Sequence, residues 1–360
     1  MSKSMLKEWT AHELVAELRR RERVALTEQT GADRARAIPA SVVGRSHELQ
    51  QLSTAELAKL AQDRQRAIYG VDNRQDLYLV KSAKVHAAAK GVVALVKTTD
   101  LHRKSDGSYT LATEPYRDAY RLCANEPFVS QPTGCFCSGF LVAPDVVATA
   151  GHCVKSPADL ANTRFVFGFR MVDANNARTS FSADDVYAGS RLIGRQLAGD
   201  GTDWSLVRLD RPVVGRKPVK IRTRGKIANK QALFVIGHPC GLPQKYAPGA
   251  QVRDNIPAPY FVANLDTYGG NSGSPVFNAG NTTVEGILVR GENDFVTNGS
   301  CYVSLVCPST GCRGEDVTRS TVWAGKVLKQ KTRSRPASGP RKTGRRRATK
   351  SAARPRRKKT

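Results

Sequence analysis

Long apolar runs are missing from this chain of 360 residues. None approaches the ~18–20 residues that a membrane-spanning helix needs, so no membrane span is expected. The N-terminal sequence MSKSMLKEWTAHELVAELRRRERV contains no apolar stretch of about 7–15 residues and no small-residue cleavage site. An ordinary secretory signal is therefore not expected there.

Acidic and aromatic residues are missing from the C-terminal end. Residues 331–360 contain 14 Lys and Arg and no Asp or Glu, which is about half of the formal net charge of +26. Pro, Gly, Ser and Ala mixed with like charges cannot bury enough surface to fold, so 326–360 is predicted to be a disordered Lys/Arg-rich tail. Such a tail can contact a polyanion or an acidic surface, but without an aromatic residue after Trp323 it cannot stack on bases.

The number and placement of the cysteines bear on whether the chain contains disulfides. All eight cysteines lie between residues 123 and 312. An even number confined to one region indicates a disulfide framework in an oxidising compartment. The alternative is buried free thiols in a cytosolic protein, which the missing signal sequence favours, and the sequence leaves both open. Among the three neighbouring cysteines near the end of this region, the pairing selected is Cys307–Cys312.

The sequence pattern changes from helical to strand-like near residue 67. Residues 1–66 read as helical, with an S/T-x-x-E capping box at Thr10–Glu13, but they are rich in Arg and poor in large apolar residues. They are predicted to be an appendage or a pro-region. From Ile68 onward, short β-branched or aromatic runs alternate with Gly-, Asn- and Asp-rich turns, which is typical of an all-β protein. Residues 67–325 have a comfortable length for two barrels.

The segment DTYGGNSGSPVF places one hydroxyl, that of Ser272, among residues that have almost no side chain. A hydroxyl is a poor nucleophile until a base takes its proton and donors stabilise the oxyanion that forms. Backbone N–H groups can converge on one oxygen only where the chain turns tightly without bulky side chains. The N–H groups of Gly270 and Ser272 are therefore candidate oxyanion donors.

A histidine is the expected base, and the chain has six. Only His152, in CSGFLVAPDVVATAGHC, stands in a context that explains its position, directly before Cys153. His238 lies near Cys240 in GHPCG, but two donors do not make a zinc site, so no metal is expected. The carboxylate that would orient the base is assigned to Asp203, just ahead of the alternating run WSLVRL. Its neighbours Asp200 and Asp210 read as loop and turn residues.

Taken together, in the order His, Asp, Ser, these segments resemble the trypsin-like serine peptidases of the chymotrypsin fold. TAGHC at 149–153, DWSLVRL at 203–209 and GNSGSP at 270–275 each stand where that family carries its triad. GNSGSPVFN and AIYGVDNR at 67–74 are similar to the bacterial glutamyl endopeptidase branch, the latter to its mature start. The resemblance covers about residues 67–325 and extends neither to the first 66 residues nor to the tail.

The resemblance implies two six-stranded antiparallel β-barrels and a serine endopeptidase that forms an acyl-enzyme and needs no cofactor. His152 would be the general base, Asp203 its orienting partner and Ser272 the nucleophile. The substrate would be a protein or peptide. The resemblance also implies a disulfide between Cys137 and Cys153 around the histidine, and an extracytoplasmic or secreted location of bacterial type.

Substrate preference is where the chain departs from the glutamyl branch. The strand GILVRG at 286–291 is implied to hold the substrate backbone, through Leu288, Val289, Arg290 and Gly291. The glutamyl branch carries a histidine where this chain has Leu288, which argues against a glutamate preference. Asp266 stands six residues before Ser272, where trypsin carries the acid of its specificity pocket, so Arg or Lys is expected before the cleaved bond. The alternative is that Asp266 merely caps a turn.

Two further hypotheses concern the ends of the chain. Cleavage near Arg66–Ala67 would free the start of the barrel domain, as in a zymogen, whereas the competing idea is a permanent N-terminal docking module. The alternative to an enzyme is a polyanion-binding protein that acts through its basic tail on an inactive peptidase-like scaffold.

Overall fold

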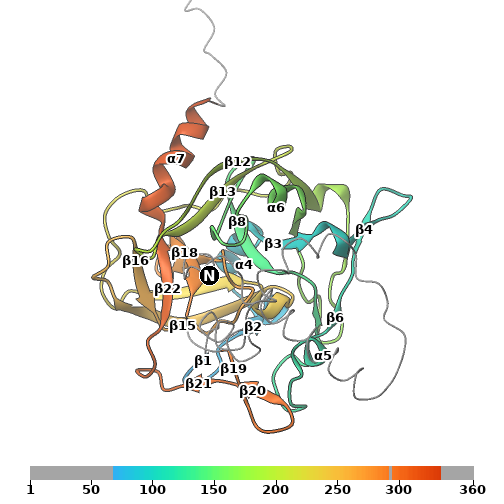
Figure 1. Ribbon diagram of the computed structural model, residues 1–360, viewed down its shortest axis with the longest axis vertical. Helices are drawn as coiled ribbons and strands as arrows, with labels where there is room; N and C mark the ends of the chain where they lie inside the picture. Colours follow the sequence, from blue (N-terminus) through green and yellow to red (C-terminus); the bar gives the residue numbers. More distant parts are fainter. Residues whose placement is uncertain (1–67, 292–293, 334–360) are drawn as a thin grey trace, which may run out of the picture.

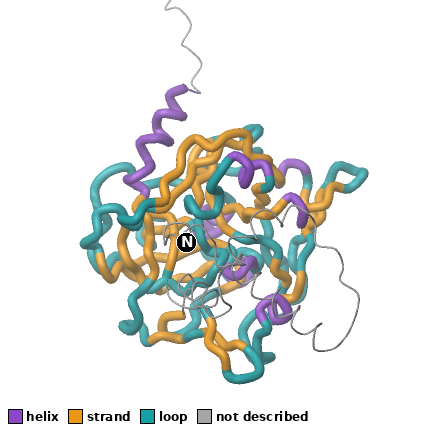
Figure 2. The backbone as a smooth tube through the Cα atoms, viewed as in Figure 1, coloured by secondary structure: helices purple, strands orange, loops and turns teal. Residues whose placement is uncertain are grey.

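The computed structural model describes residues 68–291 and 294–333. Strands predominate in this part of the chain, and the helices, apart from α7 (Ser320–Arg333), are short (Figures 1 and 2). Within these residues, no helix is both long and apolar enough to cross a membrane. The helical segment predicted for 1–66 and the tail beyond residue 333 lie outside the described residues.

The first barrel is a closed sheet of six antiparallel strands. Its strands, in order around the barrel, are β10 (Thr163–Phe167), β12 (Val186–Leu197), β13 (Asp203–Leu209), β9 (Val146–Thr149), β8 (Cys137–Ala143) and β3 (Val92–Lys97). Every residue of β8 is buried, on the outer face as well as the inner one. Phe140 of this strand packs edge-on against Trp323, with ring centroids 6.0 Å apart.

The second barrel also has six antiparallel strands, and it closes through pairing of its first strand with β15. Its strands are β14 (Ala232–Gly237), β17 (Pro275–Asn278), β18 (Val284–Arg290), β22 (Glu315–Arg319), β16 (Tyr260–Ala263) and β15 (Lys245–Asp254). A separate apolar core fills it, with Leu233, Val276 and Val317 all nearly inaccessible. The two six-stranded antiparallel barrels predicted from the sequence are therefore confirmed.

Short strands and helices complete the described chain. The additional strands are β1 (Ile68–Tyr69), β2 (Gln75–Asp76), β4 (Leu101–Arg103), β5 (Tyr109–Leu111), β6 (Glu114–Pro115), β7 (Pro132–Thr133), β11 (Ser180–Phe181), β19 (Phe295–Thr297), β20 (Tyr302–Ser304) and β21 (Val306–Cys307). The α-helices are α4 (Ala83–Ala89), α5 (Tyr116–Tyr120), α6 (Pro157–Ala161) and α7 (Ser320–Arg333).

The segment from β1 to β2 lies along the second barrel. Strand β1 pairs in parallel with β21, and β2 pairs with β15. Lys245 forms a buried ion pair with Asp76, and its Nζ also donates to Gln131 Oε1 at 2.5 Å. Burial lowers the pKa of Lys245 to about 8. The start of the described chain is thus held by a buried polar cluster as well as by strand pairing.

Helix α7 extends past the domain boundary expected at residue 325. Trp323, Ala324 and Val327 are buried, and their spacing places them on one face of the helix. That face packs against the barrels, while the far end of the helix projects from the body (Figure 1). The expected boundary therefore falls within a packed helix, and the residues to Arg333 are helical.

Three disulfides are present among the described residues. Cys137–Cys153 and Cys307–Cys312 have the partners expected from the sequence, and Cys123–Cys301, which joins segments 178 residues apart, was not expected. Cys135 and Cys240 are free and buried. The chain thus combines a disulfide framework with two buried thiols.

Candidate active site

Strand register places His152 beside Asp203. In the antiparallel pair β9–β13, Thr149 lies opposite Ser205, so Gly151 comes opposite Asp203. The Gly151 N–H donates to Asp203 Oδ1 at 2.6 Å, and the His152 N–H donates to the same oxygen at 3.2 Å. The other carboxylate oxygen, Oδ2, lies 2.6 Å from His152 Nδ1. Because a carboxylate only accepts, His152 Nδ1 carries the proton, and Nε2 is left as the basic nitrogen.

The carboxylate of Asp203 is buried but ionised. Burial opposes its ionisation, yet the nearby imidazole of His152, the charge of Arg290 and the Gly151 N–H together hold its pKa below the ordinary value. Glycine is required at residue 151, since a Cβ there would lie 2.5 Å from the carbonyl oxygen of Gln196. The arrangement holds the imidazole in one tautomer.

The turn that carries Ser272 is shaped by two glycines. Gly270 and Gly273 have φ values of +84° and +89°, a region that residues with a Cβ rarely adopt. A Cβ at Gly273 would also overlap the Ser138 carbonyl and the Thr149 hydroxyl. The Asn271 N–H donates to Tyr268 O at 3.1 Å, which closes the turn. The small residues noted in the sequence are therefore required by backbone conformation and by close packing.

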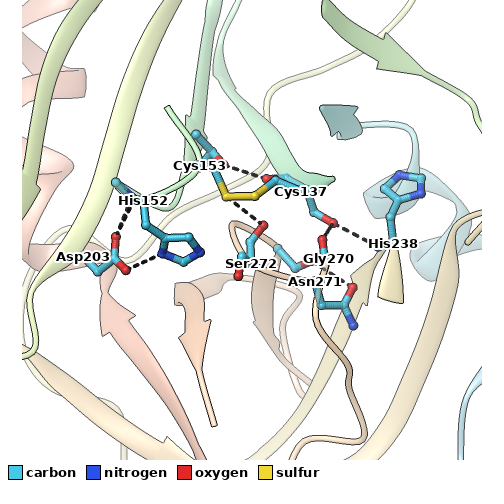
Figure 3. The surroundings of a disulfide bond; sticks show 12 residues. Cys137, His152, Cys153, Asp203, His238, Gly270, Asn271 and Ser272 are labelled. Carbon is cyan, nitrogen blue, oxygen red and sulfur yellow. Dashed lines mark hydrogen bonds and ion pairs between the residues drawn. A yellow bond between two sulfur atoms is a disulfide. The ribbon is translucent and has the colours of Figure 1, made fainter. Parts of the chain in front are cut away.

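The structure brings the three sequence-predicted residues together. Figure 3 shows His152 between Asp203 and Ser272, with the Cys137–Cys153 disulfide beside them. The disulfide sulfur of Cys153 lies 3.6 Å from the carbonyl oxygen of Ser272. Cys137, His152 and Cys153 are near enough to hold a metal ion, but the disulfide leaves neither sulfur as a thiolate ligand.

Asp266 has contacts unlike those expected of an open specificity pocket. It is 4% exposed, its Oδ1 accepts the Tyr69 N–H at 2.8 Å, and its Oδ2 accepts the Asn73 N–H at 3.0 Å. Burial raises its pKa to about 6, although both hydrogen bonds oppose that rise. These contacts favour the alternative in which Asp266 organises a turn, here the segment that follows β1.

The expected substrate strand, β18, runs directly behind the serine turn. The Gly273 N–H donates to Leu288 O at 2.8 Å, and the Leu288 N–H donates to Ser274 O at 3.0 Å. The side chains of Leu288 and Val289 are buried. Arg290 turns its guanidinium to Asp316 and to the carbonyl of Gly201, at 2.7 and 2.6 Å. Gly291, which follows the strand, lies against the carboxylate of Glu315.

Several residues that shape this region were not identified from the sequence. Thr318, in the second barrel, accepts the N–H of Asp203 at 3.2 Å, a contact across 115 residues of chain that no local pattern signals. Ser138 contacts the turn on both sides of Asn271. Its N–H donates to Ser272 O at 2.8 Å and its hydroxyl donates to Gly270 O at 3.0 Å. The sequence feature that could have pointed to Ser138 is its position next to Cys137.

Two closed antiparallel barrels, with a His–Asp pair on one and a glycine-framed serine on the other, define a chymotrypsin-like fold. Residues 137–287 match the trypsin-like peptidase domain. The matched range includes His152, Asp203 and Ser272.

Curated relatives are distant. A glutamyl endopeptidase of Bacillus licheniformis is 27% identical over 150 residues, which is 39% of this chain and 45% of that protein. A secreted RxLR effector protein of Plasmopara viticola is 26% identical over 219 residues, or 55% of this chain and 48% of that protein. The chain thus spans about half the length of these relatives. A solved Glu endopeptidase structure, 16% identical, covers 74% of this chain and is itself wholly covered, with a TM-score of 0.43.

Proposed function

We propose that this protein is a serine endopeptidase. In this proposal, His152 is the general base, Asp203 orients it and Ser272 is the nucleophile. The matched domain and the three polar residues gathered in one place support it. No cofactor is needed, because the base, the nucleophile and the oxyanion donors are all protein groups.

The proposed reaction uses the basic Nε2 of His152. This nitrogen takes the proton of the Ser272 hydroxyl while Oγ attacks the carbonyl carbon of the substrate peptide. The N–H groups of Gly270 and Ser272 stabilise the oxyanion. His152 then gives the proton to the leaving amine, which leaves an acyl-enzyme on Ser272, and a water molecule activated by the same histidine releases the acid.

The observation that carries this proposal is the hydrogen bonding of Asp203. Its two oxygens bind the backbone of Gly151 and His152 and the Nδ1 of the ring. A scaffold that only binds a ligand does not need an imidazole held in one tautomer beside a glycine-framed serine. The inactive-scaffold alternative is therefore less favoured.

Labelling with a fluorophosphonate probe tests the proposal. We expect stoichiometric labelling of the native protein at Ser272, located by peptide mapping, and none after unfolding. Ser272→Ala should abolish labelling and reduce hydrolysis of a casein substrate by more than about 10⁴-fold. Ser300→Ala, a serine on the exposed turn after β19, is the control and should label normally. Absence of labelling in the folded native protein would contradict the proposal.

A preference for Arg or Lys before the cleaved bond stays a prediction. Asp266 alone supports it poorly, since both of its oxygens accept backbone N–H groups. Glu315 is a second buried acid in this region. It is inaccessible to solvent, lies against Gly291, and accepts the Tyr69 hydroxyl at 3.2 Å. We propose that a basic substrate side chain would be drawn to these two carboxylates together.

A peptide panel that varies only the residue before the cleaved bond tests this preference. Wild type should favour Arg and Lys over Glu and Phe in kcat/KM. Glu315→Gln and Asp266→Asn are isosteric, so a loss of the Arg preference in one of them identifies the acid that matters. Preferential cleavage after Glu would overturn the preference for basic residues.

Activation and location are proposed from the ends of the barrel domain. We propose removal of residues 1–66 by cleavage near Arg66–Ala67, because Ile68 is already buried and pairs with Val306. The three disulfides are consistent with an extracytoplasmic or secreted protein. Intact mass and N-terminal sequencing of the secreted protein test both. Full activity with Met1–Arg66 attached would contradict a zymogen.

The basic tail is proposed to contact polyanions or acidic surfaces without taking part in hydrolysis. Because α7 packs through Val327, the tail should be removed after Arg333 rather than at residue 327. Deletion of 334–360 should leave peptide hydrolysis unchanged and abolish retention on heparin at low salt. Retention that persists after this deletion would place the polyanion contact elsewhere.

A further inference from the structure

The peptide bond between Gly269 and Gly270 has a fixed orientation. The carbonyl oxygen of Gly269 accepts the Cys240 N–H at 2.5 Å. All described peptide bonds are trans, and a trans peptide directs its C=O and N–H to opposite sides. The Gly270 N–H, a proposed oxyanion donor, therefore points away from Cys240.

Ser138 holds the next carbonyl along the turn. Its hydroxyl donates to Gly270 O at 3.0 Å and accepts the His238 N–H at 3.0 Å. A serine hydroxyl has one hydrogen to donate, and here the carbonyl of Gly270 receives it. The Ser138 N–H donates to Ser272 O. This completely buried serine thus binds the backbone on both sides of Asn271 and joins it to the loop that begins at His238.

The loop at His238–Leu242 is itself rigid. The His238 ring stacks on Phe169, with centroids 5.8 Å apart, and its Nδ1 lies 3.0 Å from Leu242 O. Burial lowers the pKa of His238 to about 4, so the ring is neutral and Nδ1–H donates to that carbonyl. Cys240 has a φ of +51°, which a residue with a Cβ adopts only when its surroundings impose it. Figure 3 shows His238 on the opposite side of the disulfide from His152.

From these contacts we infer that Ser138 is a positioning residue for the oxyanion site: the Cys240 N–H holds the peptide plane that presents the Gly270 N–H, and the Ser138 hydroxyl holds the carbonyl of the next plane, so the turn cannot rotate about Gly270. Ser138 does not contact substrate in this arrangement. The inference rests on the proposed peptidase function. An ordinary buried serine would affect stability alone. Ser138 should also affect catalysis, because the carbonyls of Gly269 and Gly270 are both held by donors outside the turn.

Ser138→Ala tests this inference against a purely structural role. The variant leaves the Gly270 carbonyl and the His238 N–H without their partner, so the turn can rotate. We expect kcat to fall by about 10–100-fold, less than the ~10²–10³ for loss of an oxyanion donor itself. KM should change by less than about twofold, because ground-state binding does not use the oxyanion site. Binding of a peptide boronate, whose adduct on Ser272 places an oxygen in that site, should weaken by the same factor as kcat.

Ser320→Ala is the matched control. Ser320 is equally buried and donates its hydroxyl to the carbonyl of Arg222 at 2.8 Å, at the start of α7. This variant should lose thermal stability to a similar degree while kcat and boronate binding stay within twofold. If Ser138→Ala does not fold, Thr133→Val serves instead. The Thr133 hydroxyl donates to the carbonyl of Cys240, the residue whose N–H holds the carbonyl of Gly269.

The outcomes separate this inference from the proposed function. An active wild type whose kcat is unchanged in Ser138→Ala, or in Thr133→Val, overturns the positioning role and leaves the peptidase proposal intact. An equal fall of kcat in Ser138→Ala and Ser320→Ala also overturns it, since the effect is then one of stability. A wild type that neither hydrolyses peptides nor reacts with a fluorophosphonate overturns both.

Discussion

The two halves of the candidate site are built by different means. His152 and Asp203 are placed by strands β9 and β13 of one barrel, where a single antiparallel register puts Gly151 opposite the carboxylate. Ser272 lies on a turn between strands of the other barrel. That turn takes its shape from glycines with positive φ and from hydrogen bonds that come from outside it.

The difference predicts how each half responds to damage. A side chain placed by strand register stays in position when one of its own atoms is changed, so isosteric substitution there should affect chemistry and leave stability nearly unchanged. A turn held by remote groups has few bonds of its own. Substitutions at Asp266 or Lys245 should therefore change the free energy of unfolding of the second barrel.

The largest effect is expected in the first half, for Asp203→Asn. An amide in place of the carboxylate presents its NH₂ or its carbonyl to Nδ1 and favours the wrong imidazole tautomer, so kcat should fall by about 10⁴-fold. Urea unfolding should show little change in stability. Asp210→Asn, which removes an exposed carboxylate paired with Arg211, is the control and should keep full activity. A loss below tenfold in Asp203→Asn would remove Asp203 from the proposed mechanism.

The second effect concerns the polar cluster that holds the start of the chain. Lys245→Met leaves the buried carboxylate of Asp76 without its ion-pair partner, and we expect a loss of about 3–5 kcal/mol in the free energy of unfolding. Asp76→Asn combined with Lys245→Met should recover much of it, because no buried charge then remains. Lys226→Met, at an exposed lysine, should be neutral in the same urea titration. Equal stability of Lys245→Met and wild type would show that the pair contributes nothing.

Much of the fold could be predicted from the sequence, because short alternating runs and turn residues report strands directly. The short β-branched or aromatic runs from Ile68 onward predicted an all-β protein with two barrels. Helix α7 continues past the boundary expected at residue 325, and the basic residues of this segment mask the apolar face of the helix in the sequence. A face of three residues, Trp323, Ala324 and Val327, is too small to stand out against so many charges.

The polar site was less completely predictable. His152, Asp203 and Ser272 lie in local patterns that identify them without neighbours. By contrast, Ser138 and Thr318 act through contacts across 100 or more residues, and a local sequence pattern does not report such a contact. Asp266 shows the converse difficulty. Its register suggested a substrate contact, but two backbone N–H groups nearly 200 residues away occupy its oxygens.

The third effect tests the serine turn itself. Gly270→Ala adds a Cβ that would lie 2.8 Å from the carbonyl oxygen of His238, at a φ of +84°. We expect kcat to fall by about 10²–10³-fold, as for loss of an oxyanion donor. Gly215→Ala is a matched control with a φ of +70° and nothing within 4 Å of the added carbon, so it bears the same backbone strain without touching the site. Equal kcat values in the two variants would mean that the turn tolerates rotation.

The smallest effect, that of Asp266, depends on pH. Its pKa of about 6 in the folded chain lies above the ordinary value of 3.8, so the unfolded state releases this proton at lower pH than the folded state does. The contribution of Asp266 to stability is therefore fully present below about pH 4 and is lost as pH rises through about 6. The shift of about two pKa units corresponds to at most about 3 kcal/mol.

Asp266→Asn removes this titration and isolates it. The amide still accepts one of the two backbone N–H groups but turns a donor toward the other, so the variant should be less stable than wild type at every pH. Because the wild-type carboxyl is most favourable when protonated, the deficit should be largest near pH 4 and should shrink by up to about 3 kcal/mol toward pH 7. Urea unfolding of both proteins at pH 4, 5, 6 and 7 measures it. A deficit that is constant with pH would show that folding does not shift the pKa of Asp266, and that the second barrel anchors its N-terminal segment without a titrating group.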